Sequence, residues 1–346
     1  MEITIWGSGA IGGTIGAYLA RAGEKITFVD ASEEHVRAVR ECGLTIKAPA
    51  ETFTVQAPAF TPTEVRGPLS VVFLAVKAMH TETATRQIAP HLTKDSYVVS
   101  FQNGLNELTI SDTVGKERTV GCFINFGADY LEPGVVTYGG PGALYLGELD
   151  GQMTPRLREI HAAVSKFLPT VRMTGNVWGY LWGKLGYASV LFATALVNEP
   201  IWVVLKEHGY RPLLANLVAE VVRAAEARGV RCEGFDGYEP HAMRFAAPRN
   251  WPGIHESFDV LVTFNRNSGK QYSGIWRDRA VRKRKTEVDH QIGLVVDLAE
   301  KDGIDLPLNR RLTRMIRDLE EGRRVMSWTN VDELVALNDS LPAPYA

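Results

Sequence analysis

The sequence has few cysteines, and they are not grouped as in a metal site or a disulfide framework. Cys42, Cys122 and Cys232 are far apart and odd in number, and no CxxC or Cys/His cluster accompanies them. We therefore predict free thiols in a reducing compartment and no bound metal. An excess of charge is also missing, because 38 basic residues face 40 acidic ones. This balance gives no indication of binding to nucleic acid or to an anionic membrane.

Long apolar runs are absent as well. No apolar stretch reaches the roughly 18 residues of a membrane span. The chain begins directly with a strand-like run, which leaves no room for a signal peptide. We therefore expect a cytoplasmic protein. The length of 346 residues indicates two domains, at about 100–200 residues for each domain.

Glycine, in contrast, forms an informative pattern near the start of the chain. Residues 2–6 are a short apolar run, followed by Gly7-Ser8-Gly9-Ala10-Ile11-Gly12 and an apolar stretch through Ala20. A second apolar run, residues 26–29, ends in Asp30. This order of strand, glycine turn, helix, strand and acid is one βαβ unit. In that context GxGxxG is a dinucleotide-binding fingerprint rather than a chance match.

Each part of the fingerprint has a physical role. We expect Gly7 to permit the tight turn, Gly9 to let the backbone approach a pyrophosphate, and Gly12 to let the helix pack closely on the sheet. The helix starting near Ala10 directs unpaired N–H groups toward the phosphates. Asp30 accepts hydrogen bonds from the adenosine ribose. The alternative is a glycine-rich turn in an α/β protein that binds no nucleotide.

Two further apolar runs end in polar residues. Residues 71–76 and 97–101 read as central strands buried on both faces, and Lys77 and Asn103 follow them. In open parallel sheets, ligands bind outside the carboxyl ends of the strands. Both side chains are therefore candidates to face the cofactor. The alternatives are a surface lysine and a turn residue before Gly104.

The pattern changes near residue 175, where strand signals stop. Helical periodicity then covers about 177–206, 211–229, 285–303 and 307–323, whereas residues 232–275 have no clear assignment. We predict an α/β dinucleotide-binding domain over residues 1–174. A mostly helical domain follows over residues 175–346.

Two charged residues of the second half stand in unusual surroundings. Lys184 has Trp182 and Leu185 among its apolar neighbours, and a partly desolvated lysine is a better proton donor near neutral pH. Glu287 lies near the start of a late helical stretch. The alternatives are a helix-surface lysine and an ordinary first-turn glutamate.

These motifs together resemble the ketopantoate reductase family over about residues 1–325. The glycine fingerprint is joined by further matches: Ala75-Val76-Lys77-Ala78, Gln102-Asn103-Gly104, Pro133-Gly134-Val135-Val136, Trp182-Gly183-Lys184-Leu185 and Thr286-Glu287-Val288-Asp289. The resemblance implies an N-terminal Rossmann domain and a helical C-terminal domain of the 6-phosphogluconate dehydrogenase type. It also implies an active site in the cleft between them and a homodimer.

The resemblance also implies roles for individual residues. Lys184 matches the family's catalytic lysine, the general acid for the reduced carbonyl. Asn103 matches the asparagine that holds cofactor and substrate, Lys77 the lysine near the nicotinamide, and Glu287 the glutamate lining the cleft. The implied reaction is hydride transfer from a nicotinamide cofactor to a small anionic 2-oxo acid, giving a 2-hydroxy acid.

The chain departs from the family pattern in its substrate-binding residues. Ala188 and Phe192 stand where the family helix usually presents asparagines, so Phe192 is a candidate to line a more apolar pocket. Ser273 is a candidate match to the family serine, and Arg277 beside Trp276 is a candidate carboxylate clamp.

Three questions stay open at this stage. Asp30 followed by Ala31 favours NAD, because a carboxylate repels a 2′-phosphate; NADP is the alternative. The reaction could also be dehydrogenation of another hydroxy acid or reduction of an imine. A nucleotide sensor without catalysis is the alternative outside the enzymes, against which the presence of Lys184, Asn103 and Glu287 argues.

Overall fold

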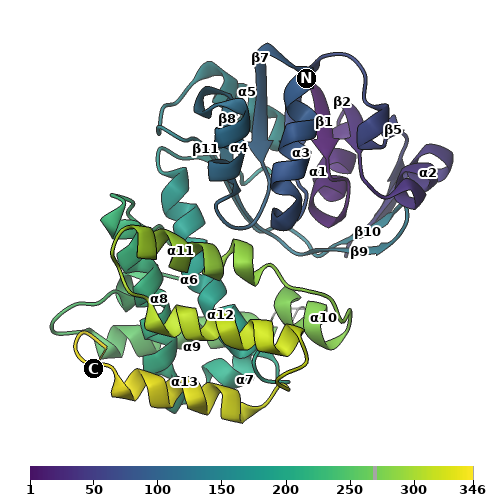
Figure 1. Cartoon of the computed structure of the whole chain (residues 1–346). Helices are drawn as coiled ribbons and strands as arrows, with labels where there is room; N and C mark the ends of the chain where they lie inside the picture. Colours follow the sequence, from purple (N-terminus) through teal and green to yellow (C-terminus); the bar gives the residue numbers. More distant parts are fainter. Residues whose placement is uncertain (268–270, 346) are drawn as a thin grey trace. The chain divides into compact units, whose positions relative to one another are not determined.

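The structure is a computed structural model that describes residues 1–267 and 271–345. The chain divides into two compact units, Met1–Val177 and Trp178–Ala346, whereas the sequence analysis places the boundary after residue 174. The first unit is built on a sheet and the second on helices (Figure 1). The predicted α/β class with a mostly helical second part is confirmed.

The first unit contains an eight-stranded sheet whose strands follow the order β12-β11-β8-β7-β6-β1-β2-β5. The bounds are β1 Glu2–Trp6, β2 Lys25–Val29, β5 Ala59–Phe60, β6 Leu69–Leu74, β7 Leu92–Ser100, β8 Thr119–Asn125, β11 Ala143–Glu148 and β12 Arg172–Met173. The strands from β5 to β8 run parallel, and β11 lies antiparallel to β8. From β1 the chain first adds β2 on one side and later β6 on the other, so the strand order reverses at β1 and β6.

Helices cover both faces of this sheet, because alternate residues of each strand point to opposite faces. In β1, Ile3 and Ile5 enter one core, whereas Trp6 enters the other. The helices are α1 Ala10–Arg21, α2 Glu33–Cys42, α3 Thr81–Ile88, α4 Asn106–Val114 and α5 Pro155–Val164. Residues of α5 pack in the core of Ile3, and residues of α3 and α4 pack in the core of Trp6.

A second, smaller sheet packs against α1. Its order is β4-β3-β10-β9, with bounds β3 Leu44–Lys47, β4 Thr52–Val55, β9 Ala128–Glu132 and β10 Val135–Tyr138. The turn between β9 and β10 contains Pro133 and Gly134, and Gly134 has a φ of +77°. These four short strands therefore form a sheet of their own, separate from the main one.

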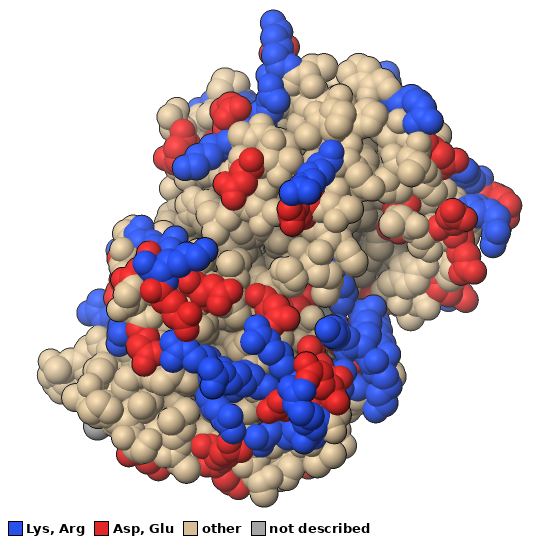
Figure 2. Space-filling model, viewed as in Figure 1, with Lys and Arg blue, Asp and Glu red and all other residues tan. Residues whose placement is uncertain are grey.

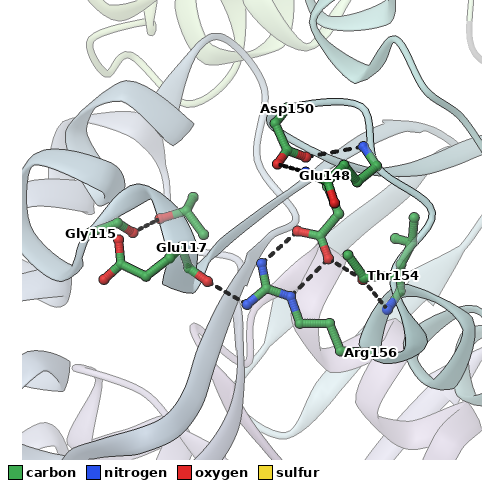
Figure 3. Close-up of polar contacts among 9 residues, drawn as sticks. Gly115, Glu117, Glu148, Asp150, Thr154 and Arg156 are labelled. Carbon is green, nitrogen blue, oxygen red and sulfur yellow. Dashed lines mark hydrogen bonds and ion pairs between the residues drawn. The ribbon is translucent and has the colours of Figure 1, made fainter.

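An ion pair between a buried glutamate and a half-buried arginine lies where β11 ends (Figure 3). The Arg156 guanidinium binds both carboxylate oxygens of Glu148, with Nε 2.8 Å from Oε1. Thr154 also donates to Glu148, and Arg156 donates to the backbone carbonyl of Glu117. Because β11 is antiparallel, this cluster lies at the edge opposite to the carboxyl ends of the parallel strands.

The second unit consists of helices over the part that the structure describes. They are α6 Val177–Thr194, α7 Ile201–Leu205, α8 Arg211–Ala227, α9 Trp251–Asn267, α10 Gly274–Ala280, α11 Ile292–Lys301, α12 Pro307–Glu320 and α13 Trp328–Ser340. Helix α8 is buried along most of its length and contacts α9, α11, α12 and α13. Most of its buried residues are apolar, as expected of a helix in such a central position, and its buried Asn216 and Glu220 have hydrogen-bond partners.

Two predicted helical stretches differ in the structure, and further helices were not predicted. The stretch 177–206 is two helices, since α6 ends at Thr194 and Pro200 precedes α7; a proline there lacks the N–H that would continue a helix. The stretch 285–303 forms an α-helix only from Ile292. Helix α9 fills much of the unassigned segment, and α13 was not predicted.

Charged side chains of both signs are interspersed on the face of the helical unit shown in Figure 2. Three arginines of α12 pair with carboxylates of neighbouring segments. These pairs are Arg310 with Glu300, Arg311 with Glu333, and Arg317 with Asp289. The high arginine content of α12 is therefore balanced locally by acidic partners.

Candidate functional site

The glycine loop follows β1 and has the geometry that its sequence predicts. Gly7 has a φ of +95°, and its backbone N–H donates to the carbonyl of Val29 at 2.7 Å. A Cβ at Gly7 would lie 2.7 Å from the backbone nitrogen of Val76. Any other residue would therefore be strained by its φ angle and would also collide with the loop after β6.

Gly12 and Gly9 differ in their surroundings. A Cβ on Gly12 would lie 2.1 Å from the Gly7 carbonyl oxygen and 2.8 Å from Cγ2 of Ile5, so only glycine lets α1 pack here. A Cβ on Gly9 would meet nothing within 4 Å. Gly9 is the N-cap residue of α1, with no side-chain cap for the first N–H groups. Open space beside a bare helix start that includes Ala10 and Ile11 fits a bound pyrophosphate.

Ser8 is held on both sides of its backbone. Its N–H donates to Oδ2 of Asp30 at 2.9 Å, and its carbonyl lies 3.0 Å from Nε2 of His35. His35 is buried, and its Nδ1 accepts from the N–H of Gly134 at 3.0 Å. Because Nδ1 is an acceptor, Nε2 carries the proton and donates to Ser8. His35 thus joins the glycine loop to the turn between β9 and β10.

Asp30 lies half-buried at the end of β2. Its second oxygen, Oδ1, accepts from the backbone N–H of Ser32 at 3.0 Å. Oδ2 also accepts from the Ser8 hydroxyl at 3.5 Å. Because each carboxylate oxygen has two lone pairs, Oδ1 can still accept a hydrogen bond from a ribose hydroxyl. Asp30 therefore has two functions open to it: it orders the glycine loop, and it presents an acceptor at the end of the strand.

Lys77 and Asn103 follow the neighbouring strands β6 and β7. The backbone N–H of Ala75 donates to the carbonyl of Trp6 at 2.8 Å, and that of Phe101 donates to the carbonyl of Leu74 at 2.8 Å. Backbone hydrogen bonds therefore join the loops after β1, β6 and β7 at the point where the strand order reverses. Open α/β sheets bind ligands at such a point. The structure thus gathers Lys77, Asn103, Asp30 and the glycine loop at one edge of the sheet.

Lys184 lies in the middle of α6 and is half-buried, between buried Gly183 and Leu185. A Cβ on Gly183 would lie 2.2 Å from the carbonyl oxygen of Glu233, and the N–H of Glu233 donates to the carbonyl of Gly179 at 2.9 Å. The small residue before the lysine therefore lets the segment around Glu233 pack directly on the helix that carries it.

Ser273 and Arg277 belong to the short helix α10. Ser273 is its N-cap residue, with Oγ accepting from the N–H of Trp276 at 3.0 Å. Arg277 lies one turn later and is half-buried, and its backbone N–H donates to the carbonyl of Ser273 at 3.1 Å. The Trp276 indole donates to Oδ1 of Asn198 at 2.9 Å. The hydroxyl of Ser273 thus fixes the start of the helix that carries the candidate clamp.

Comparison with known proteins decides the family. A family model described as Ketopantoate reductase PanE/ApbA matches residues 3–151, and the model described as Ketopantoate reductase PanE/ApbA C terminal matches residues 176–320. The chain belongs to the ketopantoate reductase family. It is an oxidoreductase of the class that acts on CH–OH groups.

Individual relatives cover nearly the whole chain. The 2-dehydropantoate 2-reductase of Pyrococcus abyssi is 28% identical over 327 residues, which are 94% of this chain and 100% of the relative. That of Halobacterium salinarum is 27% identical, covering 92% of this chain and 98% of the relative.

Two solved structures also cover 93% of this chain and 99% of their own. A ketopantoate reductase from Ralstonia eutropha has a TM-score of 0.78 at 25% identity. A D-mandelate dehydrogenase with NADH and anilino(oxo)acetate has a TM-score of 0.79 at 21% identity. The second likeness is one of fold.

Within this ketopantoate reductase family chain, Glu287 is not in the first turn of an α-helix. It is half-buried and precedes a single 3₁₀ turn, Val288–His290. The preceding Thr286 is buried, and its backbone N–H and its hydroxyl both donate to Oε1 of Glu320, at 2.7 and 2.6 Å. The position of Glu287 is therefore fixed by its neighbour's bonds to α12 rather than by helix geometry.

Phe192 has the surroundings of a core residue. Its side chain has no exposed surface, and Ala188 one turn earlier is also buried. The burial favours the packing role for Phe192. Its contact with a substrate stays a prediction that the burial does not support.

The described residues include neither a metal-binding cluster nor a membrane-spanning helix. Among residues 1–267 and 271–345, no group of three or more His, Cys, Asp or Glu side chains could hold a metal ion. Over the same residues, no helix is long and apolar enough to cross a membrane. Cys42, Cys122 and Cys232 are free thiols.

Sequence reasoning missed His35. The Pro133-Gly134 motif was recognised, but nothing in the sequence connects it to a histidine far earlier in the chain. Only the packing of the small sheet beside α1 brings the two together.

Proposed function

We propose that this protein reduces a small anionic 2-oxo acid to a 2-hydroxy acid with a nicotinamide cofactor. One observation carries the proposal: the loops after β1, β6 and β7, with Lys77 and Asn103 on them, meet at the reversal point of the sheet beside a glycine loop that has room for a pyrophosphate. Family membership then supplies the class of reaction.

The cofactor provides a hydride at C4 of the nicotinamide when it is bound. The glycine loop holds the pyrophosphate at the start of α1, and Asp30 accepts hydrogen bonds from the adenosine ribose. Because Asp30 would repel a 2′-phosphate, NAD is the proposed cofactor and NADP the alternative. Lys77 and Asn103 orient the nicotinamide and the substrate.

The helical unit contributes the proton. Reduction of the substrate's carbonyl group would place negative charge on its oxygen. The Lys184 ammonium stabilises the developing alkoxide and then donates a proton to it, and the lysine recovers a proton from water. Glu287 orients the substrate. This assignment rests on the family match of Lys184, supported by its half-buried place in an apolar helix.

The substrate is proposed to differ from ketopantoate. Ala188 and Phe192 replace the amide side chains that hold polar groups of the family's substrate, and a hydroxyl left without partners binds poorly. Arg277 is the proposed carboxylate clamp, and Ser273 holds the helix that carries it.

A panel of 2-oxo and 2-hydroxy acids, each tested with NAD(H) and NADP(H), decides the function. We expect the highest kcat/KM with a 2-oxo acid that lacks the hydroxyl of ketopantoate, and Arg277→Ala should raise KM for it by about tenfold or more. A wide preference for ketopantoate would contradict the substrate proposal. Turnover of imines but of no 2-oxo acid would show that the protein is an imine reductase instead. NADH binding without turnover of any compound would indicate a sensor.

We also propose a cellular location and an oligomeric state. Cytoplasmic location and a homodimer follow from the sequence analysis and the family resemblance. Sedimentation of the purified protein tests the dimer directly.

A further inference from the structure

A buried chain of polar side chains links the loops after β6 and β7. The Gln102 amide nitrogen donates to the backbone carbonyl of Val76 at 2.8 Å and to the hydroxyl of Thr81 at 2.7 Å. Thr81 donates in turn to Oδ1 of Asn106 at 2.8 Å, and Nδ2 of Asn106 donates to the backbone carbonyl of Asn103 at 2.7 Å.

The direction of every hydrogen bond in this chain is determined. Gln102 uses both hydrogens of its amide nitrogen, and Thr81 accepts one bond and donates its single hydroxyl hydrogen onward. The exposed fractions of Gln102, Thr81 and Asn106 are 3%, 1% and 7%. With so little water available, a broken link would leave buried polar groups unpaired, which favours one arrangement of the chain.

The side chains of Thr81 and Asn106 bond outside the helices that they begin. Thr81 and Asn106 are the first residues of α3 and α4, and neither helix has a side-chain cap. Their side chains bond to each other, to the Gln102 amide and to the backbone of Asn103. Thr85, one turn after Thr81, shows the local alternative, since its hydroxyl donates to the Thr81 carbonyl of its own helix at 2.6 Å.

The two carbonyls that the chain holds lie at the residues of interest. Val76 immediately precedes Lys77, and its backbone nitrogen is the atom nearest to where a Cβ of Gly7 would lie. Asn103 is itself a candidate site residue. One end of the chain therefore fixes the loop of Lys77 against the glycine loop, and the other fixes the backbone of Asn103.

We propose that Gln102, Thr81 and Asn106 are positioning residues that set the spacing of Lys77 and Asn103, and so determine how the nicotinamide end of the cofactor and the 2-oxo acid are held. This inference rests on the proposed function. It adds that Gln102, Thr81 and Asn106 act without touching the reactants. They act through the backbone of the two residues that do, Lys77 and Asn103.

Thr81→Val tests the proposal, because valine keeps the shape of threonine and removes the hydroxyl in the middle of the chain. Thr81→Ser restores the hydroxyl. Thr85→Val is the matched control, since it removes an equally buried hydroxyl from the next turn of the same helix. Each variant is measured for melting temperature, for kcat and KM with the best 2-oxo acid, and for binding of NADH and of ADP-ribose, which lacks the nicotinamide.

We expect Thr81→Val to lower kcat/KM by about tenfold or more. NADH binding should weaken while ADP-ribose binding stays unchanged. Thr81→Ser should recover most of the loss, and Thr85→Val should lower the melting temperature without changing the ratio of the two dissociation constants. Equal kinetic effects of the two valine variants, or unchanged kinetics in Thr81→Val, would overturn the proposal.

The binding comparison separates this inference from the proposed reaction. If the wild-type protein binds NADH but reduces no 2-oxo acid, the proposed reaction is wrong. The dissociation constants of NADH and ADP-ribose then still decide whether the hydrogen-bonded side chains position the nicotinamide. If NADPH is the better cofactor, the binding comparison uses NADPH and 2′-phospho-ADP-ribose in place of NADH and ADP-ribose. A wild-type protein that binds none of these compounds overturns both proposals.

Discussion

The Asp30 carboxylate accepts a hydrogen bond from the backbone N–H of Ser8 at 2.9 Å, so the acid expected to bind ribose also orders the glycine loop. This double use affects how the cofactor prediction should be tested. Removing the side chain would loosen the loop as well as remove the charge. Asparagine removes the charge and keeps an acceptor oxygen.

Asp30→Asn should narrow the preference for NADH over NADPH. The repulsion between a carboxylate and a 2′-phosphate in a partly buried site is expected to be worth a few kcal/mol, or about a hundredfold in preference. The ratio of kcat/KM for the two cofactors measures the effect. Equal or better efficiency of the unaltered protein with NADPH would contradict the prediction.

His35→Ala should weaken NADH binding by about tenfold, because the Ser8 carbonyl and the Gly134 N–H both lose a partner in a buried place. Isothermal titration of NADH measures the change. His91→Ala is the control, because the ring Nδ1 of His91 hydrogen-bonds to the carbonyl of Gly67 at an exposed place. Similar losses in both variants would exclude a specific role for His35 in the loop.

Lys184→Ala should lower kcat by roughly 10²–10⁴-fold, the usual range for loss of a general acid. The NADH dissociation constant should change little, because the glycine loop belongs to the other unit. Steady-state kinetics beside a binding titration separate the two effects. Lys301→Ala, at an exposed position in the last turn of α11, is the control. Near-normal kcat in the Lys184 variant would make that lysine a structural residue.

Glu107 should make the protein less stable as the pH rises. It has no exposed surface, and neither of its carboxyl oxygens has a hydrogen-bond partner of normal geometry. Burial raises its pKa to about 8, an effect that the nearby Ser100 hydroxyl and Cys122 backbone reduce only in part. Because the unfolded chain releases this proton near its ordinary value of 4.5, stability falls between about pH 4.5 and 8.

Glu107→Gln should remove this loss, which is at most about 1.4 kcal/mol per pH unit. Urea unfolding at several pH values measures the difference from the unaltered protein. The comparison is needed because Glu220, whose pKa burial raises to about 7, shifts stability in the same direction in both proteins. Parallel stability curves for the two proteins would show that Glu107 does not titrate in this range.

Arg156→Ala should destabilise the first unit by about 3 kcal/mol, because it leaves the Glu148 carboxylate buried without its cation. Arg86→Ala is the matched control: Arg86 forms an exposed pair with Glu82 on α3, and such pairs contribute about 0.5 kcal/mol or less. Thermal or urea unfolding measures both. Comparable small effects would mean that the cluster of Figure 3 is solvated in solution.

Local patterns in the sequence determined much of the first unit. The glycine fingerprint and the apolar runs before Lys77 and Asn103 placed β1, α1, β6 and β7, because backbone conformation and strand burial depend mainly on residues close in sequence. The same patterns predicted the need for glycine at positions 7 and 12, which the contacts of both residues explain. Helical periodicity over residues 177–206 placed Lys184 on a helix, which the structure gives as α6.

Only the tertiary structure decided which distant residues meet. It put His35 between Ser8 and Gly134, joined Gln102, Thr81 and Asn106 into one buried chain, and placed Phe192 in the core. None of these contacts leaves a periodic signal. A hydrogen bond between side chains far apart in sequence depends on the packing of whole helices and sheets, and the sequence does not show that packing residue by residue.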